Sequence, residues 1–395
     1  MWTLASLVVA SSVACRTPAH DERREALTFE RLPPVDLRLQ IDPRYDARAT
    51  LAARRALMRL GDWLGAPPFQ QLTIVPAATS AAARGAVAVD TPWLASARGG
   101  ALESEIVVGI ARQFWDPQRT QKSLKGVEEP DSPEPWLREG LALYVAAKVL
   151  DDQFAGEHAY ERRWLGGLVP YALRSVPIEG PDAQLARLPA TPEAVRTAAA
   201  LFTLERYLGW ATLQQVLSAF AERAQAGPVT VVNLFETLDT VSGRDLRWFQ
   251  DEVFRSARTF DYGVDRLTTA PATRAASFDT SVVVRRYGDA VFAGTGQAPT
   301  GPYQSSGPLE VLVRFADGSE IRERWDGRAA SVQYDYESRS PAVSAEIDPD
   351  RVLWLDRNPA NNQRMLTDTS RGAMAWAARW SVWLQDRLLD YAFFF

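Results

Sequence analysis

The side chains that could bind a metal ion or act as a nucleophile are scarce in this sequence. There are two histidines, His20 and His158, which lie 138 positions apart, and one cysteine, Cys15. A catalytic zinc site built on a helix needs two imidazoles four positions apart and a carboxylate from a neighbouring helix. No such histidine pair occurs in the chain. The sequence therefore predicts no metal site and no cofactor.

Other catalytic motifs are missing as well. The chain has no G-x-S-x-G nucleophile elbow, no G-x-x-x-x-G-K-S/T phosphate loop and no G-x-G-x-x-G dinucleotide loop. A Ser–His–Asp site would need His20 or His158, and both lie in polar, charged segments. A hydrolase that works through two carboxylates remains open, because acidic residues are plentiful, but no particular pair is indicated.

Two stretches have the apolar spacing of helices that could carry a site. Glu103–Trp115 reads E-S-E-I-V-V-G-I-A-R-Q-F-W, and Trp136–Leu150 opens with W-L-R-E-G-L-A-L-Y-V-A. The second stretch resembles W-L-N-E-G-x-A-x-Y, a motif of the membrane-alanyl-aminopeptidase family of gluzincin zinc peptidases. The first resembles the frame of that family's H-E-x-x-H-Q-W motif. The resemblance covers about residues 45–360 and is specific at residues 136–144.

This chain departs from the family at the positions that the resemblance assigns to zinc chemistry. Val108 and Gly109 stand where the family has its first His and the Glu that acts as general base. Arg112 stands in place of the second His, and only Glu139 of the ligand set is retained. One carboxylate would not hold zinc against water. We therefore assign no catalytic, metal-binding or substrate-binding residue.

Two further parts of the family's site are absent. The resemblance places the family's G-A-M-E-N motif, which grips the free amine of the substrate, at Gly85–Val89, where no glutamate occurs. It places the transition-state tyrosine near Ala194, with no tyrosine within several positions. Amine recognition is thus expected to be lost together with the metal.

Arg112 and Glu139 should meet where the zinc would lie if the chain folds as the family does. A planar guanidinium can bind a carboxylate through two parallel hydrogen bonds, which would offset the cost of leaving Glu139 unpaired. We predict this salt bridge; the alternative is that each side chain faces solvent independently. Glu103 and Glu105, at the start of the first helix, are expected to favour its dipole.

Composition limits the class of protein. The chain has 395 residues, of which 46% are hydrophobic and 24% are charged, as is ordinary for a globular protein. A net charge of −5 and a pI near 5.4 argue against a nucleic-acid partner.

The two ends of the chain indicate the cell envelope. In residues 1–15 an apolar run of eleven residues, Leu4–Ala14, is too short to span a bilayer but suits a signal peptide. The sequence S-V-A-C resembles a lipoprotein cleavage box with Cys15 as the lipid-bearing residue; the alternative is an ordinary signal peptide with an incidental cysteine. We expect an exported protein, either periplasmic or anchored to the membrane.

The other end, residues 371–395, is expected to be an amphipathic helix. Trp376, Trp380 and Trp383 lie on one of its faces, and tryptophan prefers the boundary between water and lipid. This face could contact a membrane surface or a partner, or it could dock on its own protein.

The fold class expected is α+β. A mainly helical gluzincin (thermolysin-like) domain with a small N-terminal sheet is expected at residues 31–270, after a tether at residues 16–30. An antiparallel β-sandwich is expected at residues 275–358, where apolar and polar residues alternate and Asp317-Gly318 indicates a hairpin. The C-terminal helix at residues 371–395 would complete the chain.

These observations favour an inactive aminopeptidase-like protein, a pseudoenzyme that binds a peptide or a protein partner at the cell envelope. One alternative is a hydrolase that acts through unrecognised carboxylate chemistry. The other is a structural subunit of a membrane complex, held by its C-terminal helix.

Overall fold

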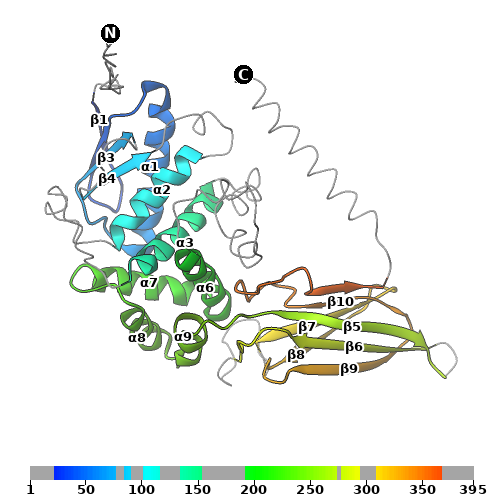
Figure 1. Cartoon of the computed structure of the whole chain (residues 1–395). Helices are drawn as coiled ribbons and strands as arrows, with labels where there is room; N and C mark the ends of the chain where they lie inside the picture. The colour runs from blue at the N-terminus through cyan, green and yellow to red at the C-terminus, as the bar shows by residue number, and fades with distance from the viewer. Residues whose placement is uncertain are drawn as a thin grey trace, which may run out of the picture.

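The computed structural model describes residues 22–76, 84–89, 101–115, 134–153, 192–273, 277–293 and 308–366 (Figure 1). The elements of the first part are β1 (Arg23–Leu27), β2 (Val35–Leu39), the 3₁₀ turn η1 (Pro43–Tyr45), α1 (Asp46–Leu64), β3 (Gln71–Pro76), β4 (Ala86–Val89), α2 (Ala101–Phe114), α3 (Pro135–Gln153), α6 (Pro192–Leu208), α7 (Trp210–Ala224), α8 (Val231–Ser242) and α9 (Arg247–Phe254). Those of the second part are β5 (Tyr262–Pro271), β6 (Phe278–Arg286), β7 (Leu309–Phe315), β8 (Glu320–Trp325), β9 (Ser331–Ser338), β10 (Ala342–Ile347) and β11 (Gln363–Met365).

A four-stranded sheet opens the fold, in the order β1-β2-β3-β4. Strand β1 is antiparallel to β2, whereas β2, β3 and β4 are parallel. The helix α1 connects β2 to β3 and buries an alanine-rich face, so that α2, α3 and α7 pack closely against it. The small N-terminal sheet expected from the sequence is therefore present.

The prediction of an irregular tether is wrong for residues 23–27. They form β1, which pairs with β2 along its whole length from Arg23 opposite Leu39 to Leu27 opposite Val35. Most of this strand is charged because it lies at the edge of the sheet, where charged side chains prevent pairing with other chains. Only its last residue, Leu27, is fully buried. Without knowledge of its pairing with β2, this charged segment resembles a solvated linker.

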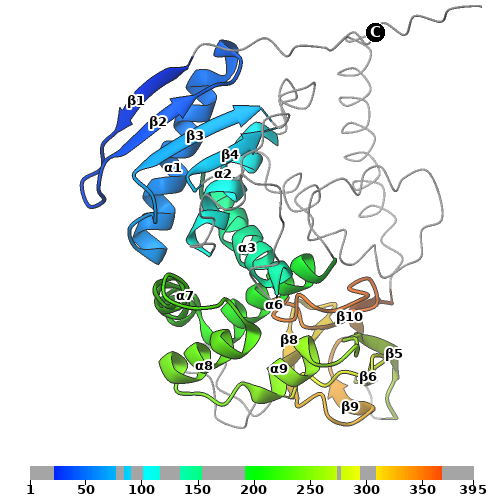
Figure 2. The same ribbon diagram turned by 60° about the vertical axis from the view of Figure 1, so that its left-hand side comes forward.

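The helix α1 lies against this sheet, and the later helices extend away from it toward the second part of the chain (Figure 2). Among these helices, α2 packs on β4 and α1, α3 packs on α2, and α6 packs on α3. The helices α7 and α8 follow, with α9 against α8. The two stretches with the apolar spacing of helices, Glu103–Trp115 and Trp136–Leu150, correspond to α2 and α3. Because α2 and α3 are neighbours, residues 27 positions apart in the sequence can meet between them.

The second part of the chain consists of two antiparallel sheets, in the orders β11-β10-β7-β8 and β5-β6-β9. The sheets contact each other through β5, which lies against β10 and β11. The predicted hairpin at Asp317-Gly318 joins β7 to β8, and Gly318 adopts a φ of 84°, which favours glycine. The expected antiparallel strands are therefore present.

The boundary expected at residue 270 is wrong. Strand β5 begins at Tyr262 and pairs with β6, so this strand belongs with the sheets and not with the helices. The strands also continue past residue 358, because β11 pairs with β10. The residues of α9, R-W-F-Q-D-E-V-F, are followed by R-S-A-R-T and then by F-D-Y, and no glycine or proline between them marks the change of structure.

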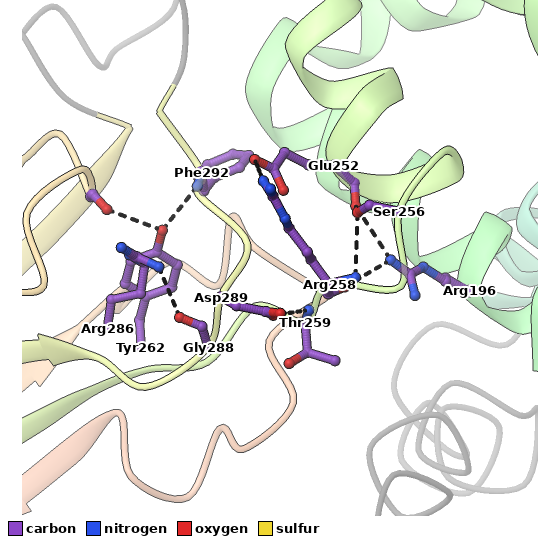
Figure 3. A network of polar contacts seen from close by, with 11 residues as sticks. Arg196, Glu252, Ser256, Arg258, Thr259, Tyr262, Arg286, Gly288, Asp289 and Phe292 are labelled. Atoms are coloured by element: carbon purple, nitrogen blue, oxygen red, sulfur yellow. Dashed lines mark hydrogen bonds and ion pairs between the residues drawn. The ribbon is translucent and has the colours of Figure 1, made fainter.

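The connection between α9 and β5 is fixed by polar contacts (Figure 3). Arg196 of α6 donates a hydrogen bond of 3.1 Å to the carbonyl oxygen of Arg258, and Arg258 pairs with Glu252 at 3.1 Å. The backbone N–H of Thr259 donates to the Asp289 carboxylate at 2.8 Å. These bonds hold the last turn of α9 to α6 and to the segment that follows β6.

A second contact joins the sheets to α6. The ring of Trp354 stacks on Phe202 with centroids 4.9 Å apart, and the backbone N–H of Trp354 donates to the Thr203 hydroxyl at 3.1 Å. Phe202 in turn meets the ring of Tyr144 of α3 edge to face at 4.7 Å. The segment between β10 and β11 is thus packed onto α6, which in turn contacts α3.

Among the described residues, no helix is long and apolar enough to cross a membrane. The predicted signal segment with Cys15, the two histidines His20 and His158, and the predicted helix at residues 371–395 lie outside the described residues.

Candidate functional site

The candidate site lies between α2 and α3, and α2 is held in place by β4. Gln113 is buried, and its amide oxygen accepts a hydrogen bond of 3.1 Å from the backbone N–H of Gly85, at the start of β4. Ile106 and Ile110 are fully buried on the inner face of α2. This packing sets the direction in which Arg112 leaves the helix.

The start of α3 is held by two other helices. The Glu134 carboxylate accepts a hydrogen bond of 2.5 Å from the backbone N–H of Val231, where it can interact favourably with the positive end of the α8 dipole. Trp136 stacks on Phe254 at the end of α9, with centroids 6.0 Å apart. These contacts position the turn of α3 that carries Glu139.

Gly140 allows α3 to approach α6. A Cβ added at Gly140 would lie 2.4 Å from the Thr197 Cβ and 2.7 Å from the carbonyl oxygen of Ala194, so a larger residue would separate the helices. Ala194, near which the resemblance places a tyrosine, is buried at this contact. The glycine of the W-L-R-E-G sequence thus has a packing role next to Glu139.

The predicted salt bridge between Arg112 and Glu139 is confirmed. Arg112 Nε donates to one carboxylate oxygen at 2.6 Å, and an Arg112 Nη donates to the other at 2.5 Å. The Arg112 side chain is 36% exposed and that of Glu139 is 18% exposed. Such a two-point contact fixes the orientation of both planes and neutralises both charges.

Gly109 and Val108 show how α2 differs from a catalytic helix. A Cβ added at Gly109 would lie 2.4 Å from Val87 Cγ1 of β4, a distance that real contacts do not reach. Any side chain at this position must therefore displace the stiff side chain of Val87 or move the helix. Val108, four positions before Arg112, is half-buried against the core and offers only an aliphatic surface.

The side chains in place do not fit a zinc ion. A catalytic zinc needs three protein ligands, but positions 108 and 112 carry a valine and an arginine, and the Glu139 carboxylate already binds Arg112. In the described ranges there is no cluster of three or more His, Cys, Asp or Glu side chains that could hold a metal ion. Strand β4, to which the resemblance assigns the amine-binding glutamate, carries only alanines and valines.

A polar cluster that the sequence analysis did not identify lies further along α3. Glu205 of α6 accepts a hydrogen bond from the Tyr144 hydroxyl at 2.6 Å and pairs with Lys148 at 2.7 Å. Burial, and then the proximity of Glu205, raises the pKa of Tyr144 well above its ordinary value, so Tyr144 is not a base. The Lys148 ammonium also lies 4.0 Å from the ring centre of Trp210. The cluster links α3, α6 and α7.

One acidic residue has a different role from the one expected. Both oxygens of Glu103 accept hydrogen bonds from Arg48 of α1, at 2.7 and 2.9 Å. Glu103 therefore connects α1 to α2 in addition to any effect on the helix dipole. Spacing along the sequence could not show this pair, because its members are 55 positions apart.

Comparisons with known proteins return only structures. No protein-family model matches the sequence, and no curated protein matches it. Aminopeptidase A of Legionella pneumophila, solved with aspartic acid, is 11% identical over 85% of this chain and 38% of its own, with a TM-score of 0.49. An M1 zinc metallopeptidase from Deinococcus radiodurans is 19% identical over 57% of this chain and 49% of its own, with a TM-score of 0.38.

A mutant of the Deinococcus radiodurans protein with a Tyr-Ser-Ala substrate gives 18% identity over 59% of this chain and 51% of its own, with a TM-score of 0.40. The chain thus spans between about a third and about half of the length of these proteins. The structural neighbours are zinc aminopeptidases, and scores this low indicate nothing about activity. Membership of the family remains a prediction from the W-L-R-E-G sequence.

Proposed function

We propose that this protein is an inactive, aminopeptidase-like component that binds a peptide or a protein partner at the cell envelope. The observation that carries the proposal is the two-point pair between Arg112 and Glu139. It uses both oxygens of the one carboxylate that the resemblance assigns to the zinc. A metal ion would have to break this pair and would gain no second protein ligand from position 108 or 112.

The contact of Gly109 with Val87 supports the same proposal. In an active relative a glutamate would stand at position 109, and its Cβ alone would overlap the Val87 side chain. The helix and the strand have packed together at the place where a general base would need room. Restoring the glutamate at position 109 is therefore expected to disturb the packing unless Val87 is changed as well.

The hydrolase alternative gains no support from the acidic residues of the helices. Glu139, Glu103 and Glu205 are each engaged by a basic side chain, with pair distances of 2.5 to 2.7 Å. The location at the envelope is supported by the sequences of residues 1–15 and 371–395. The expected lipid at Cys15 and the expected contact of the C-terminal helix with a membrane are parts of the proposal.

Rebuilding the ligand set tests whether positions 108, 112 and 139 converge as the resemblance implies. The double variant Val108→His, Arg112→His places two imidazoles four positions apart beside Glu139, and we expect it to bind one zinc ion per chain. Adding Glu139→Gln should weaken that binding at least about tenfold, because it removes a ligand. Isothermal titration with zinc measures both. A folded double variant that binds no zinc would show that these positions do not converge.

A further inference from the structure

The Arg112 guanidinium has hydrogen-bond donors that Glu139 does not use. A guanidinium carries five N–H groups, and Glu139 engages one on Nε and one on Nη2. Within the part of the chain that the structure describes, the Arg112 guanidinium makes no other hydrogen bond. The N–H groups that remain lie on Nη1 and Nη2, which form the outer edge of the guanidinium plane.

The Arg112 side chain is partly accessible, and Glu139 fixes the plane of its guanidinium. Over a third of the Arg112 side chain is exposed, whereas Glu139 behind it is mostly buried. The pair holds the guanidinium plane, and Gln113 anchors the same turn of α2 to β4. Most of the side-chain entropy that a free arginine would lose on binding is therefore already lost, which favours the binding of a ligand.

The chemistry of the edge selects a carboxylate. Two parallel N–H groups match the two oxygens of a planar carboxylate. Because Glu139 already neutralises Arg112, a dianion such as a phosphate would be repelled more strongly by Glu139 than a monoanion would be. Val108, one turn earlier on the same side of α2, is half-buried and gives the ligand an aliphatic neighbour.

We propose that the Arg112–Glu139 pair is a carboxylate-binding site, in which the outer edge of Arg112 binds a carboxylate of a peptide ligand. This inference rests on the proposed function and names the group that the protein recognises. The carboxylate could be the C-terminus of a peptide or an acidic side chain within it.

The test uses the full-length protein and three small peptides, with dissociation constants measured by ligand-observed NMR. Acetyl-alanyl-alanine carries a C-terminal carboxylate, its amide carries none, and acetyl-aspartyl-alanine amide carries one on a side chain. We expect at least one acid to bind at least tenfold more tightly than the neutral amide. The acid that binds more tightly identifies the source of the carboxylate.

Variants assign the binding to Arg112. Arg112→Gln should weaken binding of the preferred acid at least tenfold and leave the amide unchanged. The double variant Arg112→Gln, Glu139→Gln leaves no unpaired charge and should show the same loss, which covers the case in which the single variant is unstable. Arg48→Gln is the matched control, because it removes another two-point pair of α2, with Glu103, and should leave the affinity unchanged.

The outcomes separate this site from the proposed function. Equal affinity for the acids and the amide, no binding of either acid, or tight binding that survives loss of Arg112 would each overturn the carboxylate site. None of these results would indicate that the protein binds zinc or turns over a substrate, so the proposal of an inactive protein would stand. Stoichiometric zinc in the purified protein would overturn the proposed function and this inference with it.

Discussion

At the scale of single residues, the stability of the site depends on how well the negative charge of Glu139 is compensated. This carboxylate is 18% exposed, and both of its oxygens bind Arg112. Pairs at the surface contribute little to stability, whereas a carboxylate left unpaired in a mostly buried position is costly. The Arg112–Glu139 pair lies between these limits, and the exposed pair of Arg247 with Asp245 offers a comparison.

Replacing Arg112 by methionine should lower the free energy of unfolding by about 1–3 kcal/mol, because Glu139 is left without a partner. Adding Glu139→Gln should recover most of that loss. Arg247→Gln, which removes the exposed pair with Asp245, should cost much less than Arg112→Met, because solvent screens that pair. Urea unfolding measures all three. A loss for Arg112→Met no larger than that of the control would contradict the role given to the pair.

A second residue-scale prediction concerns Gly109, where two effects oppose each other. An alanine in a helix is favoured over glycine by about 1 kcal/mol, but its Cβ would overlap Val87. Overpacking of a core typically costs about 1–3 kcal/mol, so we expect Gly109→Ala to destabilise the protein. Combining it with Val87→Ala should remove the clash and restore the helix preference. A stabilising Gly109→Ala variant would show that the contact is loose.

At the scale of elements, spacing predicted α2, α3 and the β7–β8 hairpin well, because each has a strong local pattern. The predictions were wrong where pairing with a neighbouring strand decides the structure. The polar strand β1 is ordered by β2, and β5 is separated from the helices only by its pairing with β6. The Arg112–Glu139 pair was predictable because the resemblance to the aminopeptidase family implied that the two helices are neighbours. The local sequence pattern cannot show which helices pack together.

Other polar contacts were not predictable for the same reason. Tyr144 and Lys148 stand four positions apart on α3, which shows that they share a face of the helix. Their common partner, Glu205, is about 60 positions further along the chain. Only the packing of α3 on α6 brings that carboxylate to them.

The segment between β10 and β11 leads to a prediction about pH. Asp348 accepts hydrogen bonds from the backbone N–H groups of Val352 and Leu353, and Asp356 accepts from those of Tyr262 and Asn358. Burial nevertheless raises the pKa of Asp348 and of Asp356 from 3.8 to about 7. Both carboxyl groups bind protons more tightly in the folded state than in the unfolded chain.

Their stabilising contribution is therefore complete below about pH 4 and is lost as the pH rises through about 7. We expect the free energy of unfolding to fall by at least about 1 kcal/mol between pH 5 and pH 8. Asp348→Asn should reduce this dependence, since an amide resembles the protonated acid and tolerates the φ of 53°. Asp245→Asn is the control, because Arg247 lowers the pKa of Asp245 to about 2. Stability that rises from pH 5 to pH 8 would contradict this account.

At the scale of the whole molecule, the sheets and the helices are joined through α6. Trp354 packs on Phe202, which meets Tyr144 of α3, and Arg196 holds the end of α9. The helices that would carry a catalytic site are therefore held in place by other elements. Between them, Arg112 and Glu139 form an ion pair. We propose that the helices keep the framework of an aminopeptidase-like site, whereas an ion pair stands in place of its zinc ligands.

The metal content of the purified full-length protein, measured by elemental mass spectrometry, is the first test of whether the ion pair has taken the place of zinc. The same sample should be assayed for hydrolysis of aminoacyl substrates after incubation with zinc. We predict no zinc above trace level and no turnover, because Glu139 is paired with Arg112 and positions 108 and 112 supply no ligand. Stoichiometric zinc accompanied by turnover would contradict this proposal and would mean that other side chains complete a metal site around Glu139.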